Sequence, residues 1–263
     1  PPAHPAFEPV PLAGLYRVRI EFMDSINTQV ERASVLATVR DTLEASRNLC
    51  EDFIEVRAVR AEYFALCAEI DLEGDADPVE AAARLLFDIG QAIAPPVLNH
   101  DLATLLARGL TLPGIIDGPL LAHGFIDDAE LLAAALPSEL RLSDLIGVAM
   151  DVPGVRSVRT MLLNPLVRTD ENDEDAPDAD PTAVQADAVP LANAWRIPVR
   201  PGRLPRLSLN QGRLVFAKRG LPVQGWNIAD MPAAVATRLA ALREAARARV
   251  EQQAGTAIPL PAP

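Results

Sequence analysis

The sequence predicts an α+β fold in which helices cover an antiparallel-rich sheet. Residues 15–22 alternate apolar and charged side chains, which is the period of a half-buried strand. The run Asp77-Pro78-Val79-Glu80 has the cap, proline and acidic residue that begin a helix. Residues 141–159 follow the pattern of a short helix, a turn and a strand. Strands and helices that do not alternate strictly favour an α+β architecture.

The first elements are a strand over residues 15–22 and then a helix. Asp24 or Ser25 can cap that helix, which we expect to run to Ser46. Its apolar residues recur at helical spacing and are Ile26, Val30, Val35, Val39 and Leu43. Residues 53–59 and 63–72 then have the apolar, β-branched and aromatic composition of two further strands.

The middle of the chain is mainly helical. The helix that begins at Pro78 should run to about Ala94, because Pro95-Pro96 cannot continue it. Short helices are predicted over residues 101–108 and 127–136, with a loop over residues 112–125 between them.

The stretch from Arg141 to Arg159 supplies the last helix and strand of the domain. Ser143 is the predicted N-cap, and Asp144 places negative charge at the positive end of the helix dipole. Pro153-Gly154 makes the turn, and the strand runs from Val155 to the stop at Asn164-Pro165.

Residues 170–190 are predicted to be an acidic flexible linker. Residues 170–187 hold eight carboxylates and no Lys or Arg, so removing them from the net charge of −12 leaves −4 on the remainder. A segment with so few large apolar residues cannot offset its ordering entropy. The rest of the chain is nearly balanced in charge, which disfavours nucleic acid as a partner.

A small β region with a C-terminal helix is expected to follow the linker. Residues 195–199 form a short strand, residues 204–209 and 213–218 a strand pair around the Asn210-Gln211-Gly212 turn, and residues 232–253 a long helix. The predicted division is therefore a domain over residues 1–169, a linker over residues 170–190 and a second region over residues 191–263.

Three strings in the first domain resemble a known family. RNLCEDFIEVRAV, GPLLAHGFIDDAELL and SDLIGVAMDVPGVRSV are similar, in this order, to segments of the baseplate J-like wedge proteins of contractile injection systems. WRIPVR, PRLSL and RLVFAK resemble the family's continuation. Because the family's polypeptide extends on both sides, the resemblance implies that this sequence is a segment of a longer chain.

The resemblance implies a structural wedge subunit of a phage-tail-like particle. Such a subunit would pair with a second baseplate wedge protein and with further copies of itself, surround the hub and spike, and link to the sheath. It would assemble in the bacterial cytoplasm. A baseplate protein of a contractile phage tail is the alternative, since both kinds of particle would share this sequence pattern.

An alternative of another class is a Cys/His-dependent hydrolase that uses Cys50 and His123. The carboxylates beside Cys50 oppose a thiolate, and His123 lies among turn residues that suit a structural role. His4 and His100 have no acidic or Cys partner at ligand spacing, and the acidic run lacks the Gly and Glu positions of a calcium loop. The sequence therefore predicts no catalytic residue, cofactor or metal ion.

The remaining observations concern compartment and membrane. Cys50 and Cys67 are too few for a disulfide scaffold, so free thiols and a reducing compartment are expected. No stretch approaches the roughly 20 apolar residues of a membrane span, and direct membrane insertion is not expected.

One partner interface is predicted, on the C-terminal helix. Apolar residues fall at alternating four- and three-residue steps, which is the spacing of a helix-pair seam; they are Val235, Leu239, Leu242, Ala246 and Val250. The alternative is that this stripe packs on the chain's own strands.

Overall fold

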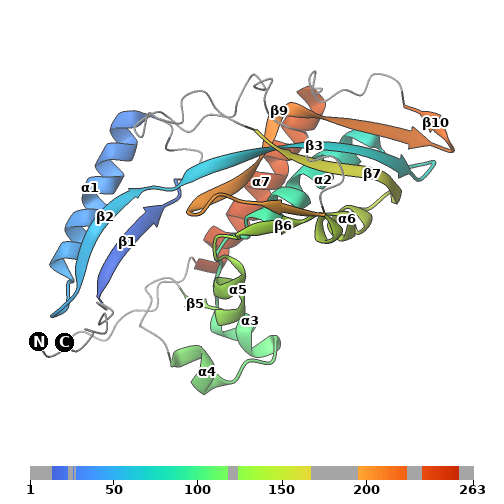
Figure 1. The fold of residues 1–263 in the computed structure, drawn as a ribbon. Helices are drawn as coiled ribbons and strands as arrows, with labels where there is room; N and C mark the ends of the chain where they lie inside the picture. Colours follow the sequence, from blue (N-terminus) through green and yellow to red (C-terminus); the bar gives the residue numbers. More distant parts are fainter. Residues whose placement is uncertain are drawn as a thin grey trace, which may run out of the picture. The chain divides into compact units, whose positions relative to one another are not determined.

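The fold comes from a computed structural model, which describes residues 14–22, 26, 28–117, 124–166, 195–223 and 233–254. The chain divides into two compact units, residues 1–60 and 61–263. Each unit is described separately below (Figure 1).

The first unit is a strand–helix–strand element. Strand β1 (Leu15–Ile20) and strand β2 (Asp52–Ala58) pair in parallel, and helix α1 (Gln29–Ala45) connects them. The cap of α1 is Thr28 rather than Asp24 or Ser25. The Glu31 amide donates to the Thr28 hydroxyl over 3.2 Å, and Glu31 accepts from the Thr28 amide over 3.2 Å. This reciprocal capping box satisfies two amides at once and fixes the start of the helix.

The two faces of the β1–β2 sheet differ in character. On one face, Glu55 accepts from Arg19 over 2.7 Å and also forms ion pairs with Arg17 and Arg57. On the other, Tyr16 stacks on Phe53 with ring centroids 5.7 Å apart. The strand predicted over residues 15–22 is present as Leu15–Ile20, and the exposure of its side chains alternates from Arg17 to Ile20.

The second unit is organised around a four-stranded sheet in the order β10-β9-β3-β7. Its strands are β3 (Arg60–Leu72), β7 (Val155–Pro165), β9 (Arg203–Lys218) and β10 (Leu221–Pro222). Strands β3 and β7 are antiparallel, as are β9 and β10. The predicted α+β fold with an antiparallel-rich sheet is confirmed.

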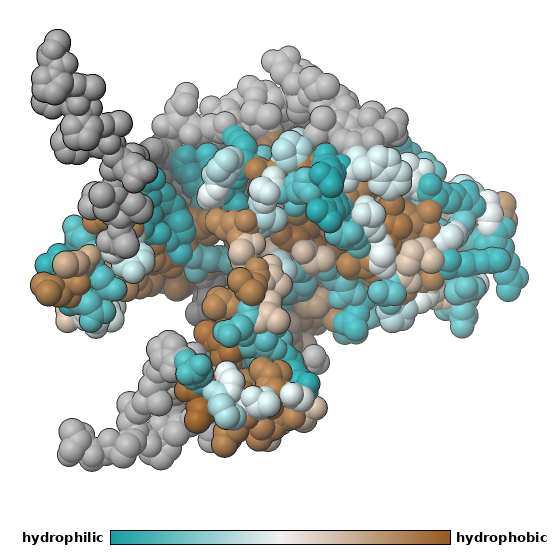
Figure 2. Space-filling view, turned by 60° about the horizontal axis from the view of Figure 1, so that its bottom comes forward, coloured by the Kyte–Doolittle hydropathy of each residue, from teal (hydrophilic) through white to brown (hydrophobic). Residues whose placement is uncertain are grey.

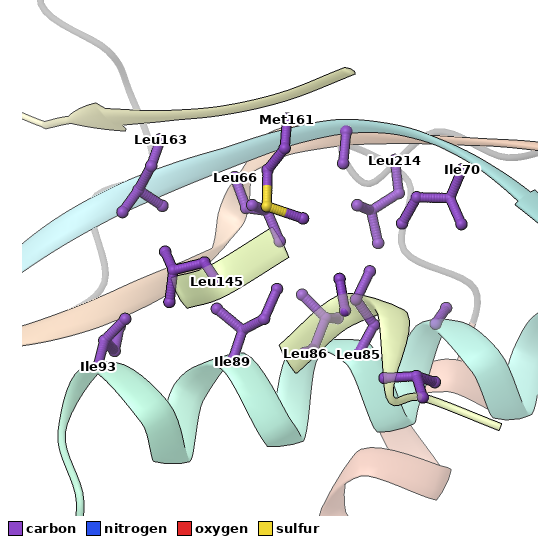
Figure 3. Packing of buried hydrophobic residues seen from close by; sticks show 14 of the residues in the cluster. Leu66, Ile70, Leu85, Leu86, Ile89, Ile93, Leu145, Met161, Leu163 and Leu214 are labelled. Atoms are coloured by element: carbon purple, nitrogen blue, oxygen red, sulfur yellow. The ribbon is translucent and has the colours of Figure 1, made fainter. Parts of the chain in front are cut away.

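The main core lies between this sheet and three helices, α2 (Pro78–Ile93), α6 (Leu142–Met150) and α7 (Ala233–Ala254). Alternate residues of β3 point into it, from Phe64 to Leu72, because successive side chains of a strand point to opposite faces. Figure 3 shows Leu66 and Ile70 above the α2 residues Leu85 and Ile89. The opposite face of β3 has a smaller cluster with Tyr63 and Leu166.

Strand β9 is continuous, so the predicted strand pair around residues 210–212 is wrong. The core side chains are odd-numbered before Asn210 (Leu207 and Leu209) and even-numbered after Gly212 (Leu214 and Phe216). This change of phase indicates a bulge, not a reversal of the chain. Gly212 has φ +135°, and a Cβ there would lie 2.6 Å from the Leu66 carbonyl oxygen, so the bulge requires glycine.

Helix α6 begins earlier than the sequence predicts, and Ser143 does not cap it. Strand β6 (Glu139–Arg141) runs directly into the helix, and Arg141 is an N-cap without a side-chain hydrogen bond. The Leu142 amide donates to the Trp195 carbonyl over 3.0 Å, because β6 pairs with β8 (Arg196–Pro198). A backbone partner from a distant segment therefore replaces the side-chain cap.

Residues 97–117 and 124–136 form a small helical lobe. It contains β4 (Asn99–His100), α3 (Leu102–Ala107), α4 (Leu112–Ile116), β5 (Phe125–Ile126) and α5 (Asp128–Ala133). The helices expected at 101–108 and 127–136 are present. The expected loop at 112–125 is wrong for its first part, because Thr111 caps a short helix in which proline occupies the first turn.

The predicted separation of residues 191–263 from the first domain also needs correction. Ile197, Leu214, Phe216, Val235 and Leu239 belong to the same buried cluster as β3 and α2. Apolar side chains on β9 and α7 bury more surface in this shared core than a separate small region could offer. The boundary between units lies after Arg60 instead. The predicted linker at 170–190 lies outside the described residues.

Candidate functional site

The C-terminal helix holds the residues predicted to contact a partner. Val235 and Leu239 are 1% and 2% exposed, and both belong to the core cluster of this chain. Burying an aliphatic side chain of this size contributes about 1.5–3 kcal/mol, so neither is available to another protein. Leu242 packs partly against the same cluster, Ala246 is half-buried, and the side chain of Val250 lies outside the described residues. The first two residues of the stripe, Val235 and Leu239, therefore pack within this chain, as the alternative prediction has it.

An ion pair also fastens α7 to the start of α2. The guanidinium of Arg238 donates from Nε and, over 3.0 Å, from Nη2 to the two carboxylate oxygens of Glu80. This hydrogen bonding lowers the pKa of Glu80 and raises that of Arg238. Asp77 caps α2 as predicted, with its carboxylate 3.0 Å from the Val79 amide. Glu80, expected to complete the capping box, holds α7 instead.

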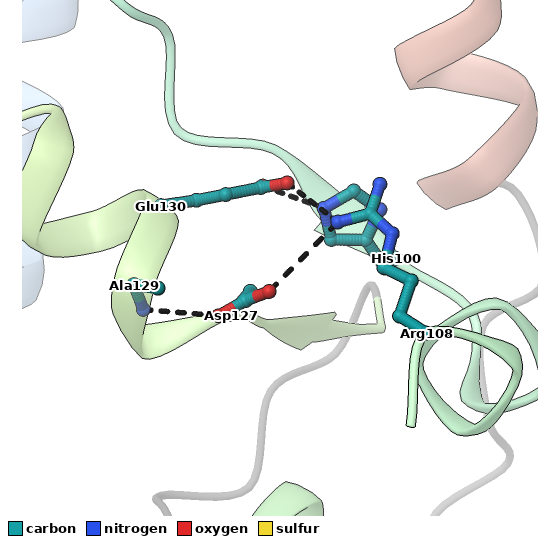
Figure 4. A network of polar contacts seen from close by, with 5 residues as sticks. All are labelled: His100, Arg108, Asp127, Ala129 and Glu130. Carbon is teal, nitrogen blue, oxygen red and sulfur yellow. Dashed lines mark hydrogen bonds and ion pairs between the residues drawn. The ribbon is translucent and has the colours of Figure 1, made fainter. Parts of the chain in front are cut away.

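A polar cluster holds the helical lobe together (Figure 4). His100 is 1% exposed, and its Nε2 lies 2.6 Å from Oε2 of Glu130. Arg108 donates to the other Glu130 oxygen over 2.6 Å and lies 3.8 Å from Asp127. Asp127 accepts the Ala129 amide at the start of α5 over 2.9 Å. Four side chains thus join β4, α3 and α5.

The electrostatics of this cluster suit a structural clamp. Burial alone would raise the pKa of Glu130, but hydrogen bonds from His100 and Arg108 outweigh it and hold the pKa below its usual value. Glu130 is therefore an ionised acceptor at neutral pH. Nδ1 of His100 is buried without a hydrogen-bond partner, and no nucleophilic side chain belongs to the cluster.

The sequence does not predict this cluster, because His100 has no acidic partner at ligand spacing. Glu130 is thirty residues away, and only the pairing of β4 with β5 brings the two together. The caps at Asp101 and Asp127 were recognisable, but they do not predict which helix lies against which.

The sequence also gives no sign of the buried carboxylate of Glu62. Glu62 is 4% exposed and accepts from the amide and the Nε of Arg200, over 2.7 and 3.1 Å. The two residues are 138 positions apart in the chain. The pair attaches the end of the β8 segment to the central strand, which is a structural role.

Of the two residues of the alternative hydrolase, the described part of the chain includes Cys50 alone. Cys50 is exposed in a turn with φ +68°, whereas Cys67 lies within β3, where burial raises the pKa of its thiol. A raised pKa keeps that thiol protonated at neutral pH. His4 and His123 lie outside the described residues.

The described ranges, residues 14–22, 26, 28–117, 124–166, 195–223 and 233–254, give no sign of a metal site or a membrane helix. There, no group of three or more His, Cys, Asp or Glu side chains is arranged to hold a metal ion. Within the same ranges, no helix has both the length and the apolar composition that crossing a membrane requires.

Comparison with known proteins decides the family. Residues 60–201 match the family described as baseplate wedge Pvc12-like domain 3, which is more than half of the chain. The chain belongs to this family. The predicted resemblance to baseplate wedge proteins is therefore confirmed.

The Pvc12-like match begins where the second structural unit begins. The units divide after Arg60, and the match extends from β3 to the segment after β8. It covers β3, α2, the lobe, β6, α6, β7 and β8, whereas β9, β10 and α7 lie beyond it.

One solved structure is similar over a longer range. It is titled the cryo-EM structure of the anti-feeding prophage (AFP) baseplate, 6-fold symmetrised. The two chains are 20% identical, and the match covers 76% of this chain and 34% of that one, with a TM-score of 0.44. This chain thus spans about a third of the length of that baseplate chain. A comparison with curated proteins found no match.

Proposed function

We propose that this chain is part of a baseplate wedge in a contractile injection system, a particle resembling a phage tail. The observation that carries the proposal is the family match over residues 60–201. In this role the chain pairs with a second wedge protein and with further copies of itself around the hub and spike, and it links the baseplate to the sheath. Assembly takes place in the bacterial cytoplasm.

The arrangement of side chains supports a structural role over an enzymatic one. Buried Glu62 and half-buried Glu130 each accept from an arginine on a distant segment, so they fasten elements together. Such cross-links suit a subunit that must keep its shape under load. The hydrolase alternative requires a reactive Cys50, and the carboxylates of Glu51 and Asp52 beside it oppose a thiolate.

The part of α7 that remains available to a partner begins at Leu242. The earlier residues of the stripe, Val235 and Leu239, are buried in this chain's core. Arg243 and Glu244, which follow Leu242, are exposed. We therefore assign the partner surface of α7 to Leu242, Ala246 and Val250.

Deletion and rescue test the proposal. Cells that lack the coding region of this chain should form no complete particles in electron micrographs, and the wild-type chain should restore them. A variant carrying Cys50→Ser, Cys67→Ser and His123→Ala should restore them equally well. Complete particles without the chain, or a triple variant that folds but fails to rescue, would contradict the structural role.

A further inference from the structure

The helical lobe exposes a concentration of large apolar side chains. Figure 2 shows apolar areas on this part of the molecule, interrupted by hydrophilic residues. Helix α5 and the residues just after it expose Leu131, Leu132 and Leu136, and Leu132 is 77% exposed. Leu106 of α3 and Leu112 and Ile116 of α4 are 44–57% exposed. Exposed apolar side chains that gather on one part of a folded protein are typical of interaction sites.

Few of the large apolar side chains in the described lobe are buried in its own interior. Its described leucines and isoleucines include two buried ones, Leu105 and Ile115. Helices of five or six residues are not stable alone. Here N-caps at Asp101, Thr111 and Asp127, together with the clamp of His100 and Glu130, hold them in place. The exposed surface is therefore presented on a fixed frame.

The charge of the lobe selects among possible occupants. Residues 97–136 contain five carboxylates, one Arg and no Lys, which gives a net charge of −4. The single cation, Arg108, is already held by Glu130 and Asp127. Asp117 directly follows Ile116, and Asp128 lies one helical turn from Leu132; both are exposed. In the described part of the lobe, the apolar side chains thus lie close in sequence to exposed negative charge.

This charge disfavours three kinds of occupant. Nucleic acid and anionic lipid would be repelled by the carboxylates. A second copy of this lobe, placed face to face, would bring like charges together. An added strand is also unsuitable, because the only sheet in the described lobe is the two-residue pairing of β4 with β5.

We propose that the lobe docks a basic amphipathic helix of another baseplate protein. Leucine or isoleucine side chains of that helix would cover the apolar face, and flanking Lys or Arg side chains would lie near Asp117 and Asp128. The statement that the helix belongs to another baseplate protein rests on the proposed function. The kind of partner rests on the exposure and charge of the lobe itself.

Site-specific cross-linking in assembled particles tests this proposal. A photo-reactive amino acid replaces Leu132 in the full chain, and a matched control places it at exposed Ser143 of α6. After irradiation, mass spectrometry identifies the cross-linked peptide. The proposal predicts that Leu132 captures a segment with helical apolar spacing and net positive charge from another baseplate protein. Capture of this chain's own residues, of a second copy or of nothing would overturn it.

Charge reversal provides a second, independent readout. Asp117→Lys combined with Asp128→Lys should slow incorporation of the chain into particles at low salt by about tenfold, since complementary charge mainly raises association rates. Circular dichroism should show an unchanged fold, because both side chains are exposed. Unchanged incorporation would contradict the docking surface alone. Failure of the wild-type chain to enter particles would instead contradict the proposed function.

Discussion

At the residue scale, Glu130 shows how a single carboxylate can join three elements. It accepts from both His100 and Arg108, and its pKa is lowered as a result. A carboxyl whose pKa is lower in the folded state stabilises that state above its unfolded pKa, here about 4.5, and loses the effect as the pH falls through the folded value.

Replacement of Arg108 by Met should therefore raise the pKa of Glu130 toward 4.5. Carboxyl-detected NMR would follow the titration of Glu130, with Arg141→Met as a control for a distant cation. The stability advantage of the wild type, about 1 kcal/mol or less for a partly exposed pair, should be present above pH 4.5 and disappear below it. An unchanged pKa in Arg108→Met would show that Arg108 does not hold this carboxylate.

Gly212 is a second residue whose replacement should destabilise the fold. Gly212→Ala should lower the free energy of unfolding by about 1–3 kcal/mol, because φ is +135° and the new Cβ would meet the Leu66 carbonyl. Chemical denaturation measures the effect. Gly147→Ala is the matched control, since that helical site has nothing within 4 Å and the change should be neutral or stabilising. Equal effects at both sites would exclude close packing of β9 on β3.

At the element scale, α7 belongs to the core for its first half. Leu239→Ala should reduce the free energy of unfolding by about 2–5 kcal/mol, which is the usual cost of truncating a buried leucine. Exposed Arg243→Ala should change it by less than about 0.5 kcal/mol. If Leu239→Ala left stability unchanged but weakened binding to a second wedge protein, the helix would dock in trans along its whole length.

The elements that sequence could predict were those fixed by local signals. Asp77-Pro78 and Asp127 begin helices because a cap acts within three residues, and Leu15–Ile20 is a strand because alternation is local. The errors arose where distant residues decide the outcome. Strand β9 continues through Gly212 because β3 lies beside it, and α6 begins at Leu142 because Trp195 supplies the partner.

The candidate site was less predictable than the fold for the same reason. The periodicity of α7 identified Val235 and Leu239 as contact residues but could not show whether the contact was with this chain or another. Likewise, His100 and Glu130 meet only through the topology of the lobe. The family resemblance, in contrast, was carried by short strings of residues and did not depend on tertiary contacts.

At the scale of the whole molecule, the boundary after Arg60 has a testable consequence. The main core cluster lies entirely within residues 61–263, so a chain that begins at Ala61 should keep cooperative thermal unfolding and nearly the same Tm. A chain that ends at residue 169, the boundary expected from sequence, should lose cooperativity because β9 and α7 are missing from the core. Calorimetry of both would decide between the two boundaries.

The central claim is that this chain is built into a baseplate wedge. A cryo-EM reconstruction of the end plate of purified particles tests it most directly. We predict density in that plate for the four-stranded sheet β10-β9-β3-β7 with α2, α6 and α7 on one face. A well-resolved end plate that lacks this fold, from particles whose mass spectra contain the chain, would contradict the claim.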